Sequence, residues 1–231
     1  MRIDKFLAEC GIGTRSEVKK YIKAKQITVN GEFLLKPDQK VDENVDVICF
    51  QGNQILYEKY VYYLLHKPSG CVTAKQDNMH KTVMEYFSEE IRDKGIAPVG
   101  RLDLDTEGML LFTNDGPLTH HLLSPTHHIP KTYYAILDKA VPETAVELFK
   151  TGVDIGDDKP TLPAKLVILS ENEAELTIHE GRFHQVKRMF EAVGCTVTYL
   201  KRLSMGPLEL GALAKGEYRK LTEDEVKLLQ K

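Results

Sequence analysis

Three segments of the 231-residue sequence place charged side chains where they could do chemistry. The first, H-K-P-S-G-C-V-T at residues 66–73, forms a shaped turn directly after an apolar run. The second, residues 98–116, puts an arginine and two aspartates, Asp103 and Asp105, ahead of an apolar strand. A carboxylate held beside a cation can act as a nucleophile or as a general base. The third, residues 180–194, has the sequence E-G-R-F-H-Q-V-K-R-M-F-E-A-V-G.

Each of the first two segments also has a plain structural interpretation. A lysine, proline and glycine after a strand are typical of an ordinary strand-ending turn. For Asp105, turn chemistry with hydrogen bonds to the backbone is the favoured interpretation. The D-x-D spacing also occurs in aspartyl phosphotransferases, but the position where those enzymes have threonine is Glu107 here. A magnesium-dependent phosphatase is therefore disfavoured.

The third segment has the period of a helix over residues 183–193. One predicted face is apolar and is made by Phe183, Val186, Phe190 and Val193. The other face carries His184, Lys187, Arg188 and Glu191. Such a helix could hold an anion or pair with a catalytic carboxylate, or it could be an amphipathic surface helix, and periodicity does not decide between these.

Several enzyme classes lose support because their motifs are missing from the sequence. There is no H-E-x-x-H metal motif, no G-x-S-x-G nucleophile turn and no Walker-type phosphate loop. The four cysteines include no C-x-x-C pair, so zinc-ribbon spacing is absent and no metal ligands are expected. An α+β enzyme and an RNA-binding protein remain as alternatives.

The charge distribution is uneven although the total is nearly balanced. The net charge of -3 argues against a protein that coats nucleic acid by bulk positive charge. Residues 1–25 nevertheless sum to +4, and residues 182–202 also concentrate basic side chains. Either run could be a solvated helix face or an RNA-binding surface. We expect neither a signal peptide nor a membrane span, which predicts a cytoplasmic protein.

The element pattern predicts two domains, residues 1–58 and 59–231, in the α+β class. The first has a helix from Ile3, a second helix capped by Thr14 and Glu17, a hairpin at Asn30-Gly31 within residues 26–35, and a strand over 45–50. A polar linker is expected at residues 51–59. Later strands are expected at 60–66, 109–113, 132–137, 164–169, 174–179 and 196–203, and helices at 83–91, 118–123, 142–150, 183–193 and 223–230. Hairpin-adjacent strands favour a mostly antiparallel mixed sheet.

Taken together, the motifs resemble bacterial ribosomal RNA pseudouridine synthases of the RsuA type over essentially the whole chain. Residues 1–50 resemble an S4 RNA-binding domain. Family motifs occur in order as K-P-S-G (67–70), G-R-L-D-L-D-T-E-G (100–108), L-L-F-T-N-D-G (110–116), K-T-Y (131–133), E-G-R-F-H-Q-V-K-R-M-F (180–190) and G-E-Y-R-K-L-T (216–222).

The resemblance assigns roles to individual residues. It implies that Asp103 is the catalytic aspartate, that Tyr133 lies against the target base and that Lys187 pairs with the aspartate. Many relatives have arginine at the position of Lys187. Arg101 is expected to fill the space left by the base or to contact phosphate, and Arg182 and Arg188 to contact the RNA backbone or to form structural salt bridges. In the N-terminal module the expected RNA-binding residues are Arg2, Lys5, Arg15, Lys19, Lys20 and Lys23.

The resemblance also implies the partner and the absence of a cofactor. Pseudouridine formation leaves the atoms of the nucleotide unchanged and transfers no electrons, so no metal or redox cofactor is expected. The expected substrate is 16S ribosomal RNA or an assembling small subunit, with no membrane partner and a monomeric enzyme. The alternatives are an enzyme acting on 23S ribosomal RNA and a non-catalytic, ribosome-associated S4-type protein.

Overall fold

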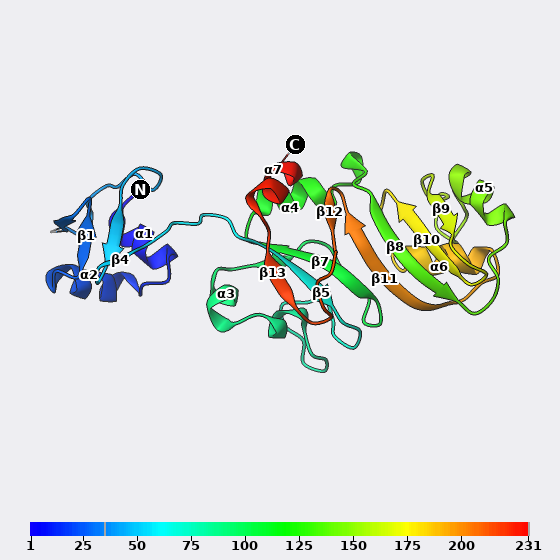
Figure 1. The fold of residues 1–231 in the computed structure, drawn as a ribbon, viewed down its shortest axis with the longest axis horizontal. Helices are drawn as coiled ribbons and strands as arrows, with labels where there is room; N and C mark the ends of the chain where they lie inside the picture. The colour runs from blue at the N-terminus through cyan, green and yellow to red at the C-terminus, as the bar shows by residue number, and fades with distance from the viewer. Residues whose placement is uncertain (35, 231) are drawn as a thin grey trace. The chain divides into compact units, whose positions relative to one another are not determined.

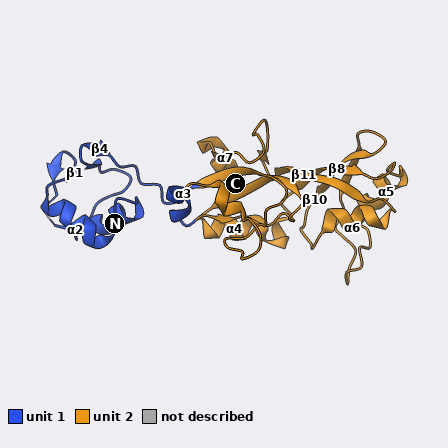
Figure 2. Cartoon of the chain, turned by 90° about the horizontal axis from the view of Figure 1, so that it is seen from below, with its two compact units in different colours: residues 1–61, 89–95 blue, residues 62–88, 96–231 orange. Residues whose placement is uncertain are grey.

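The computed structural model describes residues 1–34 and 36–230. The chain divides into two compact units, which Figure 2 distinguishes by colour. The first unit comprises residues 1–61 and 89–95, and the second comprises residues 62–88 and 96–231. Leu35, at the end of the predicted hairpin segment, lies outside the described residues. No helix in the described part of the chain is long and apolar enough to cross a lipid bilayer.

The first unit forms as the local sequence signals predict. Thr14 and Glu17 form a capping box, in which Glu17 N donates to Thr14 Oγ1 at 3.3 Å and Thr14 N donates to Glu17 Oε2 at 2.7 Å. Asn30 and Gly31 have φ angles of 53° and 86°, as the tight hairpin turn requires. Its elements are α1 (Ile3–Glu9), α2 (Arg15–Lys23), β1 (Ile27–Val29), β2 (Glu32–Phe33), β3 (Ile48–Phe50), β4 (Asn53–Gln54) and α3 (Glu89–Asp93).

The polar linker predicted at residues 51–59 is wrong for its central part. β4 pairs with β3, so within the described residues the sheet has four strands in the order β2-β1-β3-β4. Tyr57 packs its ring on Phe6, with centroids 5.3 Å apart, and donates its hydroxyl to Glu9 Oε2 at 2.7 Å. Polar composition hid this segment because both residues of β4 are exposed, and because only Ile55 and Tyr57 pack on the apolar core after it.

The second unit contains the expected strands and most of the expected helices (Figure 1). Its strands are β5 (Tyr62–Lys67), β6 (Ala97–Pro98), β7 (Glu107–Thr113), β8 (Lys131–Leu137), β9 (Lys165–Ile168), β10 (Glu173–Ile178), β11 (Val197–Met205), β12 (Leu208–Glu209) and β13 (Tyr218–Lys220). Its helices are η1 (Val83–Tyr86), α4 (Gly116–Leu123), η2 (Pro125–His127), α5 (Thr144–Thr151), α6 (Gln185–Ala192) and α7 (Glu223–Leu229).

The strands of the second unit join into one mixed sheet. Across the described residues it has nine strands, with the path β13-β5-β7-β11-β8-β10-β9, β6 beside β7 and β12 beside β11. Of the strand pairs in this part of the chain, only β7 with β11 is parallel. The prediction of a mostly antiparallel sheet in an α+β protein is therefore confirmed.

Gly108 makes the parallel junction possible. It pairs with Arg202 across β7 and β11 and has a φ of 106°. A Cβ at this position would lie 2.2 Å from the Arg202 carbonyl oxygen, which no side chain tolerates. Glycine is therefore required for β11 to approach β7 and to join the two halves of the sheet.

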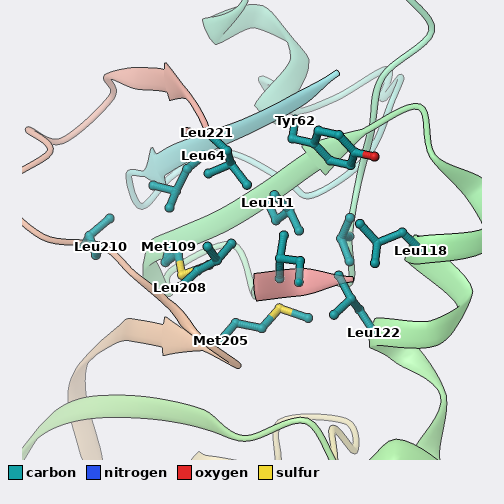
Figure 3. Packing of buried hydrophobic residues seen from close by; sticks show 12 residues of the cluster. Tyr62, Leu64, Met109, Leu111, Leu118, Leu122, Met205, Leu208, Leu210 and Leu221 are labelled. Atoms are coloured by element: carbon teal, nitrogen blue, oxygen red, sulfur yellow. The ribbon is translucent and has the colours of Figure 1, made fainter. Parts of the chain in front are cut away.

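A buried apolar cluster supports the β5–β7 half of the sheet (Figure 3). Leu64 of β5 and Leu111 of β7 are completely buried, and α4 contributes Leu118 and Leu122. Leu229 of α7 packs into the same cluster. Burial of such side chains stabilises each by about 1.5–3 kcal/mol, so the two helices are fixed on this face by apolar contact.

The single helix predicted over residues 83–91 is wrong. The chain forms the short helix η1, becomes extended at Phe87 (φ -101°, ψ 146°) and then starts α3. The Phe87 ring is buried 4.7 Å from the Phe112 ring and 4.7 Å from the Tyr218 ring, measured between centroids. Burying this ring interrupts the helix, and helical periodicity does not detect such a tertiary demand.

The end of the chain offers a test of electrostatic stabilisation. Arg219 donates two hydrogen bonds to Glu225, at 2.8 and 2.6 Å, and these outweigh the effect of burial and hold the pKa of Glu225 at about 2. An acid whose pKa is lowered by folding stabilises the fold above its unfolded pKa, near 4.5, and loses that contribution as the pH falls towards 2. We expect Glu225→Gln to lower the free energy of unfolding by about 1 kcal/mol at pH 7.

The measurement is urea-induced unfolding at stepped pH values. The difference between wild type and Glu225→Gln should shrink as the pH falls from about 4.5 to about 2. Glu223→Gln is the matched control because the Glu223 side chain is 94% exposed. A difference that stays constant across this pH range would contradict the assigned ion pair.

Candidate active site

A cleft of about 790 Å³ lies within the second unit. Arg101, Asp103, Tyr133, Arg182 and Lys187 all line it. These residues come from the loop before β7, from β8 and from the start of α6, which are far apart in the sequence. The fold thus brings together the loop and helix motifs that the sequence analysis singled out. Arg188 lies on α6 but is not among the lining residues.

The loop that carries Asp103 is clamped by the segment after β5. Thr73 Oγ1 donates to Leu102 O at 2.8 Å and accepts from Leu102 N at 3.2 Å. Gly70 N donates to Leu104 O at 2.8 Å. The turn at residues 66–73 is therefore more than a strand ending, because it fixes the backbone on both sides of Asp103.

The centre of this clamp is the ammonium group of Lys67. The side chain is fully buried, and its Nζ donates to Pro68 O at 3.0 Å, Leu104 O at 3.3 Å and Thr106 O at 2.9 Å. Burial penalises the charged form and lowers the pKa of Lys67 below its usual value, although nearby acidic groups oppose this shift. This role of Lys67 cannot be predicted from local sequence, because two of its partners lie 37 and 39 positions away.

The Asp103 carboxylate lies between the imidazole of His184 and the ammonium group of Lys187 without being fixed by either. His184 Nε2 is 3.5 Å from Asp103 Oδ1, and Lys187 Nζ is 3.7 Å from Asp103 Oδ2. Both separations exceed a good hydrogen bond. Among the described residues no group is recorded as donating a hydrogen bond to this carboxylate, which is 32% exposed. An oxygen of Asp103 is thus free to meet a reactant in the cleft.

Lys187 is bound more tightly to Asp105 than to Asp103. Its Nζ donates to Asp105 Oδ1 at 2.7 Å and to Oδ2 at 2.8 Å. Burial raises the pKa of Asp105, but the hydrogen bonds and charge of Lys187 outweigh it and leave that pKa below its usual value. Asp105 lies in a turn, as expected, but its carboxylate also holds the Lys187 ammonium group, which turn chemistry does not predict.

Tyr133 and Arg202 stand opposite each other on β8 and β11, and both line the cleft. Directly paired residues point to the same face of a sheet, so the cleft is built on this face. Tyr133 is 8% exposed. The inclusion of Arg202 in a basic surface at residues 182–202 is wrong, because it is 2% exposed and its Nε donates to Met109 O at 2.7 Å.

The start of α6 differs from the helix predicted at residues 183–193. Helix α6 begins at Gln185, after His184 adopts a left-handed backbone (φ 47°, ψ 33°). Phe183 therefore leaves the helical phase and is 76% exposed instead of joining the apolar face of Val186 and Phe190. Left-handed residues other than glycine are uncommon, and periodicity gives no sign of them.

The guanidinium groups of Arg182 and Arg188 are engaged within the chain. Arg182 binds Glu180 at 3.0 Å and Asp157 at 3.4 Å, and Arg188 binds Asp157 at 2.6 Å. These three ion pairs match the salt-bridge alternative predicted for Arg182 and Arg188. By contrast, Arg101 is exposed at the cleft, and among the described residues no ion pair or hydrogen bond is recorded for its side chain.

Comparison with known proteins decides the family. The model of the RNA pseudouridylate synthase family matches residues 61–192, and that of the S4 domain matches residues 1–47. The chain belongs to the RNA pseudouridylate synthase family. A solved structure described as a pseudouridylate synthase is 39% identical, covers 99% of both chains and has a TM-score of 0.71.

Two relatives extend over the full chain. The uncharacterized RNA pseudouridine synthase YtzG of Bacillus subtilis (strain 168) is 43% identical and the match covers 99% of this chain and 98% of the relative. The ribosomal small subunit pseudouridine synthase A of Escherichia coli (strain K12) is 40% identical, with 98% of each chain covered. Both matches span the S4 domain and the synthase unit together.

The basic residues of the S4 domain are mostly available to solvent. Arg15, Lys19, Lys20 and Lys23 are exposed on α2. Arg2 is paired with Asp4 at 2.9 Å, and Lys5 with Glu9 at 3.6 Å. Among the described residues, α2 therefore presents four exposed basic side chains with no ion pair within 4 Å, whereas Arg2 and Lys5 at α1 are paired with acidic neighbours.

Besides Lys67, two further residues at this pseudouridylate synthase site, His184 and Asp105, were not predicted as site residues from the sequence. His184 was placed on a helix face, and its approach to Asp103 depends on the left-handed backbone. Asp105 was visible in the D-x-D spacing, but its partner lies 82 positions away. In the described part of the chain no three histidine, cysteine, aspartate or glutamate side chains gather as metal ligands.

The Lys67 clamp yields a stability prediction. Lys67→Met keeps the apolar stem but leaves the Pro68, Leu104 and Thr106 carbonyls without this donor. We expect the free energy of unfolding to fall by about 1–3 kcal/mol, the usual cost of leaving buried polar groups unsatisfied. Urea denaturation measures the change, with the exposed Lys75→Met as the matched control. Equal stability of Lys67→Met and wild type would show that the clamp contributes nothing.

Proposed function

We propose that this pseudouridine synthase converts one uridine of small-subunit ribosomal RNA to pseudouridine, with Asp103 as the essential carboxylate. One observation carries the proposal: an Asp103 carboxylate without a recorded hydrogen-bond donor among the described residues, set in a cleft of about 790 Å³ between His184 and Lys187. The cleft is large enough to admit a nucleotide.

The proposed reaction uses a carboxylate in a site shaped to bind the nucleotide, and it calls for no cofactor. The bond between C1′ and N1 of uridine breaks, the base turns, and a bond between C1′ and C5 forms. C5 loses its proton and N1 gains one, so atoms and electrons balance within the nucleotide. An ionised carboxylate can serve such a reaction by attacking the sugar, by attacking the base or by removing a sugar proton.

The target base must leave its stack before Asp103 can reach it. Flipping a nucleotide out costs a few kcal/mol, and stacking on an aromatic ring returns roughly 1–3 kcal/mol per base. Tyr133 lines the cleft on the sheet face beneath it and is the candidate ring. The Lys187 ammonium places a positive charge 3.7 Å from Asp103 Oδ2, and the His184 imidazole lies 3.5 Å from Oδ1.

Support for the small subunit comes from the relatives. The Escherichia coli and Haemophilus influenzae proteins, 40% and 39% identical, are both named ribosomal small subunit pseudouridine synthase A. A non-catalytic S4-type protein would leave the clamped Asp103 loop without a role. A ribosomal substrate implies action in the bacterial cytoplasm.

Asp103→Asn should abolish pseudouridine formation while leaving the fold intact, because the amide is nearly isosteric but is neither a nucleophile nor a base. The measurement maps pseudouridines in 16S and 23S ribosomal RNA from a strain lacking the gene, then from the same strain supplied with each variant. We expect one 16S site to be lost, wild type to restore it and Asp103→Asn to leave it unmodified.

Asp158→Asn is the matched control, because Asp158 is an exposed aspartate outside the cleft lining. It should restore the site as wild type does. Thermal unfolding of purified Asp103→Asn should match wild type, which excludes misfolding. Restoration by Asp103→Asn would remove Asp103 from the mechanism, and loss of a 23S site would move the target to the large subunit.

Replacing Lys19, Lys20 and Lys23 together with glutamine should weaken RNA binding in a salt-dependent way. Removing one phosphate contact lowers the slope of log affinity against log salt concentration by roughly 0.7–0.9. We expect a fall of about 2 in that slope, measured by titrating ribosomal RNA at several salt concentrations. The control replaces Lys139, Lys150 and Lys165 with glutamine, which removes the same charge elsewhere. Identical slopes for the two triple variants would contradict an RNA-binding role for α2.

A further inference from the structure

Phe183 is a large aromatic side chain exposed at the lining of the cleft. Its exposure is 76%, so it adds little to the core. Single exposed apolar residues are common on proteins, and exposure by itself assigns no role. The contacts of this ring with neighbouring groups indicate a role.

The Phe183 ring is stacked and its backbone is anchored. The ring lies on His184 with centroids 3.8 Å apart and planes 19° apart. The Phe183 carbonyl accepts from Arg188 Nη1 at 3.1 Å, and Arg188 is itself bound to Asp157. One side of the ring is thus covered by imidazole and the rest is open to solvent. A ring held in this way loses little conformational freedom when something stacks on it.

The stacked pair extends outward from the Asp103 carboxylate. His184 Nε2 is 3.5 Å from Asp103 Oδ1, and Phe183 lies on the His184 ring. A planar group on Phe183 would therefore lie beside whatever occupies the space at Asp103. The left-handed backbone of His184 produces this arrangement, since a helical residue 183 would turn its side chain to the apolar face.

We propose that Phe183 is a stacking platform for the RNA base next to the target uridine. The inference rests on the proposed function. When the uridine flips into the cleft, its neighbour in the strand loses a stacking partner. The open side of Phe183 replaces that partner, and because every base has an aromatic face the platform accepts any of the four bases.

The test compares the steady-state kcat/KM of full-length variants on a synthetic RNA that contains the mapped target uridine. Phe183→Ala should lower kcat/KM by about 5- to 150-fold, the range that base–aromatic stacking provides. The kcat/KM of Phe183→Leu should fall by a similar factor, because leucine keeps apolar volume but has no ring. The kcat/KM of Phe183→Tyr and Phe183→Trp should stay within about threefold of wild type, because both residues keep an aromatic ring. Leu228→Ala, at an exposed leucine on α7, is the control.

Two further RNA substrates identify which neighbouring base stacks on Phe183. In one RNA an abasic residue replaces the nucleotide on the 5′ side of the target uridine, and in the other it replaces the nucleotide on the 3′ side. Wild type should lose activity on one of these RNAs, and Phe183→Ala should lose nothing further on that RNA, as expected when both changes remove one contact. Independent losses on both RNAs would overturn the inference, and so would equal kcat/KM for wild type and Phe183→Ala.

The kinetic assay and the mapping of ribosomal RNA together distinguish failure of this inference from failure of the proposed function. If wild type and Phe183→Ala form pseudouridine equally well, the enzyme keeps its assignment and Phe183 is not a stacking platform. If no ribosomal RNA site is lost in the strain lacking the gene, the proposed function fails and the inference fails with it. Thermal unfolding of each variant should match wild type because the ring is exposed.

Discussion

The buried ammonium group of Lys67 is the constraint on which the candidate active site depends. A buried cation is costly unless strong partners surround it, and here three backbone carbonyls take that role instead of a carboxylate. Two of those carbonyls belong to Leu104 and Thr106, one and three positions after Asp103. The chain can satisfy Lys67 only by holding this loop against β5, so the position of the Asp103 carboxylate depends on where a lysine is buried.

The strands extend that constraint to the rest of the site. Lys67 pairs in register with Gly108, and Gly108 pairs on its other side with Arg202 of β11. Because Gly108 has no Cβ, β11 approaches closely enough to carry its cross-strand partner Tyr133 to the cleft. The clamp, the parallel junction and the aromatic ring are therefore successive consequences of one row of residues across the sheet.

The sequence predicted the parts of the molecule that local physics determines. The strands are apolar runs, and the Thr14 capping box and the Asn30-Gly31 turn depend on neighbouring residues, so these elements were found close to their observed bounds. The errors have nonlocal causes: Phe87 breaks a helix to bury its ring against β7 and β13, and Tyr57 ties the expected linker to α1. The family motifs pointed to Asp103, Tyr133 and Lys187. The Lys67 clamp and the Asp105–Lys187 contact could not be predicted, because they join residues 37 and 82 positions apart.

The arrangement of charge around Asp103 explains why two aspartates follow each other so closely. If Lys187 bound Asp103 as tightly as it binds Asp105, the Asp103 carboxylate would be committed to a salt bridge that the substrate must break. Asp105 instead takes both short hydrogen bonds and leaves the ammonium 3.7 Å from Asp103. At that distance the ammonium group still attracts the Asp103 carboxylate, yet its two short hydrogen bonds are directed to Asp105. Asp105 thereby keeps the ammonium group in place and leaves the Asp103 carboxylate without a hydrogen bond from Lys187.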